Sequence, residues 1–140
     1  MDSLSGRVDE SHVAWASGLF DGEGSIGIQN KGYLTLRLSV TDEFTIRRFR
    51  ECVGVGTLRM NGPRLGRIQS WIWFIGARRN VEVVLRKFLP TLVTKRPQAR
   101  LALRYMSLEK SDPEREDIKR SLKGLKCRRY AGSRHPKFRE

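Results

Sequence analysis

Two acidic residues, Asp21 and Glu23, alternate with glycines inside a run of small residues over positions 16–26. The residues before them suit a packed helix, Gly22 and Gly24 suit its end, and the residues after them alternate as in a strand. Carboxylate oxygens are preferred ligands of Mg²⁺. On a chain with a formal net charge of +13, which attracts phosphates, this acid pair predicts metal-assisted cutting of a nucleic acid rather than simple binding.

The overall composition also favours a nucleic acid as the partner. The isoelectric point is about 10.7, as in many nucleic-acid-binding proteins. Residues 1–30 hold one basic and five acidic residues, whereas the rest of the chain holds 27 basic and 10 acidic ones. Arg outnumbers Lys by 20 to 8, which suits recognition of guanine and phosphate and equally fits a GC-rich coding genome. The two acids therefore belong to an acidic segment set against a positive body.

Length and residue usage limit the architecture and the cellular setting. With 140 residues, one domain with its own core is expected. Cys52 and Cys127 lack metal-site or disulfide spacing, and His12 and His135 are too few for a histidine-based nuclease site. No apolar run approaches membrane-spanning length, and the N-terminus is unlike a signal peptide. We expect a soluble intracellular protein without a membrane partner, and the Arg usage favours a bacterial or phage-infected cytoplasm over an organelle.

Hydrophobic periodicity places the acids between a helix and a hairpin. Patterns of period 3.6 and period 2, separated by turn residues, divide the chain into helices and strands. The expected elements are a helix over 11–21, strands over 25–29 and 33–40, a helix over 43–53, strands over 57–60 and 67–75, and helices over 80–89, 97–108 and 114–125. This αββαββα order with C-terminal helices predicts an α+β fold, in which helices cover one face of an antiparallel sheet.

The chain divides into three expected segments. Residues 1–10 form an N-terminal segment, residues 11–108 the core, and residues 109–140 a helical and basic extension. From Lys119 to Arg139 there are nine basic residues and no acid. Such a tail usually lies on phosphates or is disordered.

One face of the expected sheet is polar. Residues 33–40 alternate between Leu or Val and hydrogen-bonding types, so the two sets face opposite sides. Polar side chains on a sheet face can contact base edges in DNA, although a solvated face would have the same pattern. The candidate DNA-binding residues are Gln29, Tyr33, Thr35, Arg37, Arg59, Arg64, Arg67 and Gln69.

The first expected helix carries small residues at helical spacing. Ala14, Gly18 and Asp21 lie at i, i+4 and i+7, with Ser17 beside them. A stripe this small allows another helix to approach closely. The partner helix can belong to a second chain or to the same domain.

Residues 16–24 resemble the LAGLIDADG motif of homing endonucleases, in the variant that ends Asp-Gly-Glu-Gly. The resemblance extends over residues 12–108, through the hairpin, the Val53-Gly54-Val55-Gly56 turn and the Lys95-Arg96-Pro97-Gln98-Ala99 helix start. Ala16 and Ser17 depart from the Leu and Ala of the family name, at positions that only require small side chains. The resemblance implies the αββαββα fold of that family, with a concave DNA-binding saddle.

The resemblance also implies the roles of particular residues. The metal-binding acid of the family falls on Glu23, assisted by the backbone carbonyl of Gly22, while Asp21 has a structural place. Two further catalytic candidates follow by position: Asp42 at the start of the second helix, and Lys95 just before the third long helix. The implied cofactor is Mg²⁺, for which Mn²⁺ can substitute.

A single motif per chain implies a homodimer. The helices bearing Ala14, Ser17, Gly18 and Asp21 would pair about a two-fold axis and bring two copies of Glu23 together. The implied activity is a double-strand break at a long pseudo-palindromic site in double-stranded DNA, made by a homing endonuclease of a mobile intron or intein. Two alternatives share the fold: a splicing maturase that binds intron RNA, and a DNA-binding regulator without cleavage.

Overall fold

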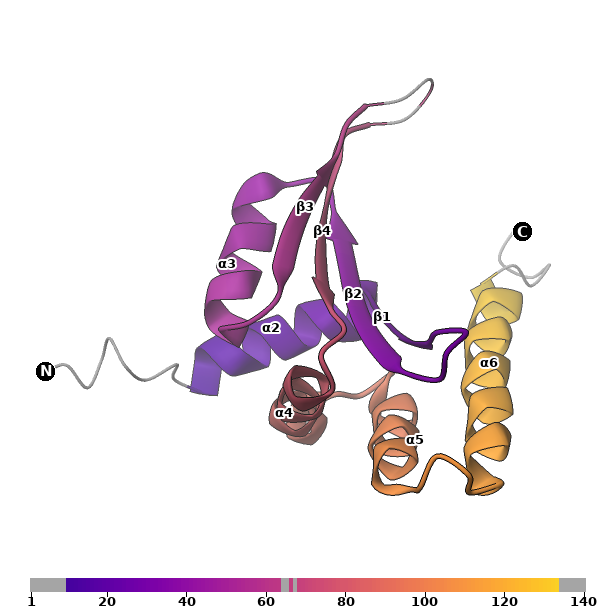
Figure 1. The fold of residues 1–140 in the computed structure, drawn as a ribbon. Coiled ribbons are helices and arrows are strands. Elements are labelled where there is room, and N and C mark those ends of the chain that lie inside the picture. Colours follow the sequence, from indigo (N-terminus) through magenta and orange to yellow (C-terminus); the bar gives the residue numbers. More distant parts are fainter. Residues whose placement is uncertain (1–9, 64–65, 67, 134–140) are drawn as a thin grey trace, which may run out of the picture.

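The computed structural model describes residues 10–63, 66 and 68–133 (Figure 1). Its elements, in order, are α2 (Glu10–Glu23), β1 (Gly24–Ile28), β2 (Leu34–Val40), α3 (Glu43–Val53), β3 (Thr57–Asn61), β4 (Ser70–Ile75), α4 (Arg78–Phe88), the 3₁₀ turn η1 (Leu89–Thr91), α5 (Arg96–Ser107) and α6 (Glu114–Ser133). The expected αββαββα order is confirmed, and two further helices follow it.

The four strands form one antiparallel sheet in the order β1-β2-β4-β3. The register pairs Leu38 with Trp73 and Leu36 with Ile75, so these large apolar side chains share one face. Arg37 pairs with Phe74 on the opposite face. Helices α2, α3 and α4 lie against the apolar face, and the other face is open (Figure 1).

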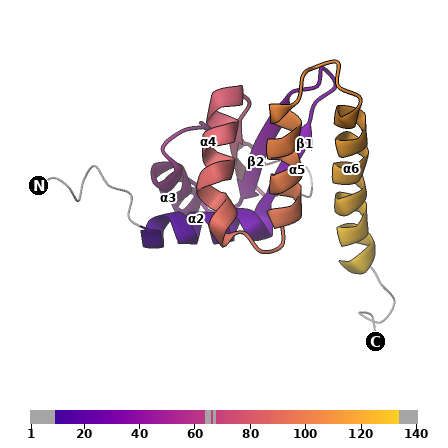
Figure 2. The same ribbon diagram turned by 90° about the horizontal axis from the view of Figure 1, so that it is seen from below.

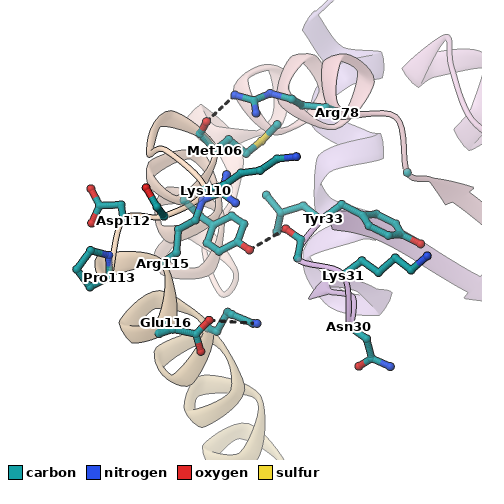
Figure 3. Close-up of a pocket in the computed structure, with 16 residues that line it drawn as sticks. Asn30, Lys31, Tyr33, Arg78, Met106, Lys110, Asp112, Pro113, Arg115 and Glu116 are labelled. Atoms are coloured by element: carbon teal, nitrogen blue, oxygen red, sulfur yellow. Dashed lines mark hydrogen bonds and ion pairs between the residues drawn. The ribbon is translucent and has the colours of Figure 1, made fainter.

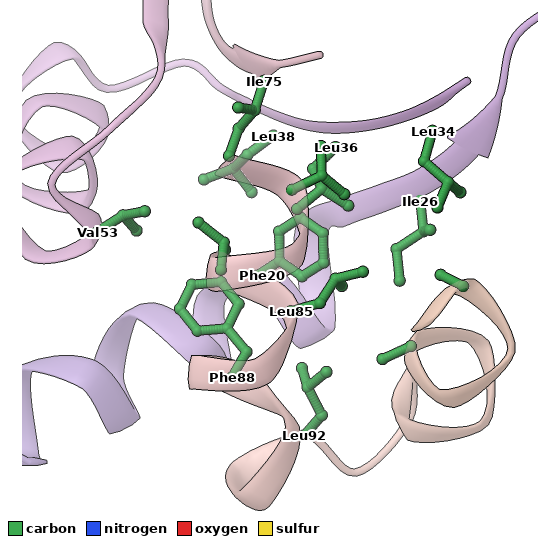
Figure 4. Close-up of a cluster of buried hydrophobic side chains, with 14 of the residues drawn as sticks. Phe20, Ile26, Leu34, Leu36, Leu38, Val53, Ile75, Leu85, Phe88 and Leu92 are labelled. Carbon is green, nitrogen blue, oxygen red and sulfur yellow. The ribbon is translucent and has the colours of Figure 1, made fainter. Parts of the chain in front are cut away.

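The apolar face and the helices enclose a single core (Figure 4). Four aromatic rings meet at its centre, where Phe49 lies 4.8 Å from Trp73 and Phe20 lies 5.6 Å from Phe88, measured between ring centroids. All four side chains are fully buried. Each such burial stabilises the fold by roughly 1.5–3 kcal/mol, so the core fixes α2 firmly through Phe20.

Helix ends follow the local sequence. The Asp42 carboxylate accepts the backbone N–H of Thr45 at 2.9 Å and caps α3. Gly54 ends the same helix with φ of 89°, a left-handed conformation that suits glycine. Residues of the local sequence therefore set both ends of α3.

Two element boundaries differ most from the expectation. Strand β4 begins at Ser70, which pairs with Asn61, the last residue of β3, so the described sheet has no ladder partner for earlier residues. Helix α6 continues to Ser133 because no proline follows Leu125 before that point to stop it. Helices α4, α5 and α6 stand in a row, with α2 crossing beside them (Figure 2). No described helix has the length and apolarity needed to cross a membrane.

Candidate active site and nucleic-acid interface

Glu23 is the last residue of α2, and its side chain is exposed. One turn earlier, Phe20 holds the helix in the core with 0% of its surface exposed. A Cβ atom at Gly24 would lie 2.3 Å from the Phe20 ring, so only glycine fits directly after Glu23. The sequence therefore ends α2 at a fixed point and leaves the Glu23 carboxylate outside the core.

Asp21 faces its own chain. Its carboxylate accepts three consecutive backbone N–H groups at the entrance to α5: Oδ2 from Val93 at 3.2 Å and Thr94 at 3.0 Å, and Oδ1 from Lys95 at 2.8 Å. Burial alone would raise the pKa of Asp21, but these N–H donors and the Lys95 charge outweigh it and hold the pKa below its usual range. Asp21 thus joins the end of α2 to the start of α5.

Lys95 completes this connection from the other side. Its side chain is 1% exposed, and its Nζ donates to the backbone carbonyl of Asp21 at 2.8 Å. A cation beside the last carbonyls of a helix is favourable, because that end carries partial negative charge. We call these contacts between Asp21 and Lys95 the α2–α5 clamp. It holds the Lys95 ammonium beside the backbone of Asp21, in the last turn of α2. Asp21 lies two residues before Glu23 in sequence.

Asp42 has a different environment. Its carboxylate accepts both the N–H and the hydroxyl of Thr45, the latter at 2.6 Å. These hydrogen bonds lower the pKa of Asp42, the side-chain bond more than the backbone bond. The Gly24–Leu38 pair places the end of α2 next to β2, and Asp42 lies four residues beyond Leu38. The Asp42 carboxylate is therefore engaged in capping α3.

Within one chain, the described residues offer a small set of metal-ligating oxygens at the end of α2. Among the described residues, no group of three or more His, Cys, Asp or Glu side chains is placed to hold a metal ion. Glu23 offers exposed carboxylate oxygens, and a backbone carbonyl such as that of Gly22 is also a hard oxygen ligand. The end of α2 thus presents oxygen donors of the type that suits a divalent cation.

Helix α2 has two distinct sides. Ala16, Ser17 and Phe20 are buried, whereas Ala14, Trp15 and Gly18 are exposed on the opposite side, as 100° per residue requires. A Cβ atom at Gly18 would meet no atom within 4 Å. We call this exposed surface of Ala14, Trp15, Gly18 and Gly22 the outer face of α2.

The expected contact surface on α2 needs correction. Ser17 is 0% exposed, and its hydroxyl donates to the Phe88 carbonyl at 3.3 Å, so it packs within the chain. The Asp21 carboxylate is held by the α2–α5 clamp. Of the four expected residues, Ala14 and Gly18 lie on the outer face. Trp15, which is 42% exposed there, was missed, although its place four residues after Ser11 and three before Gly18 marks the same side.

The open face of the sheet carries some of the expected DNA-binding residues. Tyr33, Arg37 and Arg59 are exposed, and strand register puts Arg37 and Arg59 on the face away from the helices. Thr35 is only 2% exposed, and it accepts a hydrogen bond from Gln29 Nε2 at 2.8 Å. Thr35 therefore orients Gln29 instead of presenting its own hydroxyl.

The remaining expected residues are placed differently. Gln69 donates to Met60 Sδ at 2.8 Å. Met60 pairs with Trp71, on the face of the sheet opposite to Arg59 and the open face. This position argues against a base contact by Gln69. Arg64 and Arg67 lie outside the described residues. The open face also contains Ile72 and Phe74 on β4, of which Ile72 is 6% exposed and Phe74 is half-buried.

These features define a LAGLIDADG homing-endonuclease fold. The homing endonuclease I-CvuI, in complex with a DNA target in the presence of 2 mM Mg, aligns over 83% of this chain and 82% of its own with a TM-score of 0.69 and 21% identity. The archaeal intron-encoded homing endonuclease I-Vdi141I, complexed with DNA, aligns over 83% and 84% with a TM-score of 0.67 and 10% identity. No family model and no curated protein matches the chain.

A second group of neighbours is longer. The meganuclease I-SmaMI, bound to uncleavable DNA, aligns over 80% of this chain but 43% of its own, with a TM-score of 0.61 and 14% identity. The chain therefore spans most of I-CvuI and less than half of I-SmaMI. At these identities the comparisons establish the fold.

Proposed function

We propose that the protein is a site-specific DNA endonuclease that acts as a homodimer and requires Mg²⁺. The observation that carries the proposal is the position of Glu23. Its carboxylate is exposed at the end of α2, where the outer face of the helix, the start of the sheet and Lys95 all come together. The neighbours with the same fold are homing endonucleases bound to DNA, which supports the same reaction here.

The homodimer follows from the incomplete donor set and the outer face of α2. Ala14 and Gly18 allow the backbones of two α2 helices to approach closely. Contact along this face would bring the two Glu23 side chains together at the end of both helices. Two carboxylates at close range repel each other unless cations lie between them, so the dimer creates a site that favours divalent cations.

Each residue has a distinct part in phosphodiester hydrolysis. Bound Mg²⁺ would activate a water molecule and neutralise charge on the phosphate. Glu23 would hold the metal, and the Lys95 ammonium would stabilise negative charge that develops beside the same helix end. Asp21 positions Lys95 by fixing the backbone at the start of α5.

Recognition of the target falls to the open face of the sheet. Arg37 and Arg59 can donate two hydrogen bonds each to guanine edges in the major groove, and Phe74 can contact thymine methyl groups. Two sheets related by a two-fold axis would bind a pseudo-palindromic site. The dimer would bring twice the formal charge of +13, so binding should depend steeply on salt.

The decisive experiment is cleavage of a plasmid that carries the uninterrupted insertion site of the element encoding the chain, with Mg²⁺ and then with EDTA. The wild type should cut only with the divalent ion. Glu23→Gln should abolish cutting and retain DNA binding, whereas Glu10→Gln, at the other end of the same helix, should cut normally. Cutting by Glu23→Gln at the wild-type rate would refute the role of Glu23. DNA binding without cutting in Mg²⁺ or Mn²⁺ would identify a regulator, and intron-RNA binding that promotes splicing a maturase.

The dimer interface has its own test. Gly18→Leu adds a side chain where the single chain has open space, so the variant should fold normally and sediment as a monomer. Gly124→Leu makes the same change on α6, also in open space, and should remain dimeric. A fully dimeric Gly18→Leu would exclude the outer face of α2 as the interface.

A further inference from the structure

A cavity of about 540 Å³ lies at the opposite end of strand β1 from Glu23, between the β1–β2 turn, the start of α4, the end of α5 and the start of α6 (Figure 3). The Tyr105 hydroxyl donates to the Gly32 carbonyl at 2.7 Å and ties the turn to α5 at the bottom of this cavity. The Lys110 side chain extends into the cavity, in the space between the β1–β2 turn and α5 (Figure 3). The walls therefore come from segments about 70 residues apart that are held together by a direct hydrogen bond.

The cavity walls are rich in positive charge. Asp112 and Glu116 are the two acids among the lining residues. Asp112 accepts the backbone N–H of Glu114 at 2.9 Å, and Glu116 pairs with Lys119 at 3.4 Å. Five basic residues line the same cavity: Lys31, Arg78, Lys110, Arg115 and Lys119. The cations thus exceed the acids, and both acids already have partners within the chain.

Arg115 packs against Tyr105, and the ion pairs found among residues 10–63, 66 and 68–133 do not include it. Its guanidinium carbon lies 4.3 Å from the centroid of the Tyr105 ring, in cation–π contact. Its Nε atom is buried and has no hydrogen-bond acceptor among the described residues. A buried donor left without an acceptor costs about 1–3 kcal/mol, and such donors are rare in folded proteins. An oxygen-rich anion in the cavity would give the Arg115 guanidinium a charge partner that the described residues do not provide.

We propose that this cavity binds a phosphate group through Lys110 and Arg115. The favoured source is the DNA backbone, and this part of the proposal rests on the proposed function. The turn at Gly32 joins β1 to β2, next to exposed Tyr33 and on the same hairpin as Arg37 of the open face. DNA lying on that face would pass the cavity at the outer end of the hairpin. A phosphorylated small molecule would offer the same oxygen acceptors and is the other source.

The first arm of the test measures binding of the full-length protein to a random-sequence duplex across a range of salt concentrations, with EDTA to prevent cleavage. Each phosphate contact contributes about 0.9 to the slope of log K against log salt. Lys110→Gln should lower that slope by about this amount per protomer. Lys87→Gln removes the same charge from the exposed surface of α4, outside the cavity lining, and should leave the slope nearly unchanged.

The second arm uses inorganic phosphate without DNA. Titration at constant ionic strength, with chloride as the exchanged anion, should shift the NMR signals of the Arg115 Nε–H and the Gly32 amide. Lys110→Gln should weaken this response and Lys87→Gln should not. Because Lys110 is exposed, its replacement should not affect folding, whereas Arg115→Gln would also remove the contact with Tyr105.

The two arms separate the possible outcomes. A Lys110-dependent change in both identifies the DNA backbone as the source. A Lys110-dependent phosphate response with an unchanged DNA slope supports the phosphate site and assigns it to a free phosphorylated ligand. No Lys110-dependent change in either arm overturns the proposal. The phosphate arm requires no cleavage and no DNA binding, so it remains decisive if the endonuclease function itself proves wrong.

Discussion

The two acids at the end of α2 lie two residues apart and have opposite environments. Asp21 accepts three backbone N–H groups and contacts buried Lys95, whereas Glu23 is exposed. Helix geometry separates the two by 200°, so one points toward α5 and the other away from it. The difference shows that one short motif can divide its tasks: the first acid connects two helices, and the second is left available for a ligand.

Lys95 contacts Asp21 beside the last turn of α2, and its replacement should have the largest effect. Lys95→Met keeps most of the buried side-chain volume and removes the ammonium. We expect cleavage to fall about 10²-fold, the loss typical of removing one charge-stabilising donor, while DNA affinity stays unchanged. Single-turnover cleavage and fluorescence anisotropy measure the two quantities. An equal loss of affinity would show that Lys95 binds phosphate in the ground state.

Asp21→Asn should lower stability more than any change at Glu23. The amide offers one acceptor oxygen where the carboxylate offers two, so at least one backbone N–H at the entrance to α5 loses its partner. The expected loss in the free energy of unfolding is about 1–2 kcal/mol, because solvent screens this partly exposed carboxylate. Urea denaturation followed by circular dichroism measures it. An unchanged midpoint would mean that the α2–α5 clamp contributes nothing to folding.

The same acid should make stability depend on pH. Its pKa is lower in the folded protein than the reference value of 3.8, so its contribution is fully present above that value. The contribution is lost as pH falls below 3.8 toward the folded pKa. The stability difference between wild type and Asp21→Asn should therefore shrink in acid. A difference that stays constant from pH 6 to pH 3 would contradict the lowered pKa.

Glu23→Gln should have the smallest effect on stability. The exposed side chain has no described role in folding, so the change in unfolding free energy should stay within about 0.5 kcal/mol. Denaturation without metal provides the measurement. A larger loss would place Glu23, like Asp21, among the residues that hold the fold together.

The order of elements could be predicted because the signals are local. Alternation in residues 33–40, the Asp42–Thr45 cap and Gly54 each act over a few residues. The sides of α2 were harder to assign, because Ala14, Ser17 and Gly18 are all small and small residues occur both inside and outside. The core fixed the choice, since burying Phe20 and Ala16 turns Ser17 inward and Gly18 outward.

Long-range contacts escaped the sequence analysis for a physical reason. The α2–α5 clamp joins residues 74 positions apart, and the contact between Tyr105 and Gly32 spans 73. No periodic pattern records which distant segments will meet. The burial of Thr35 likewise depends on the neighbouring strand and on Gln29, not on the alternation that put it on the polar face.

Trp15 and Trp73 occupy different surroundings, so the intrinsic fluorescence of the protein can report on self-association. Trp73 is fully buried, with its indole N–H bonded to the Val55 carbonyl at 2.9 Å, whereas Trp15 is 42% exposed on the outer face of α2. Pairing of two chains there would move the Trp15 indole out of water and shift its emission to shorter wavelength. The emission wavelength of the unlabelled protein, followed as the protein is diluted, would then report self-association. The emission of buried Trp73 would stay constant and serve as an internal reference.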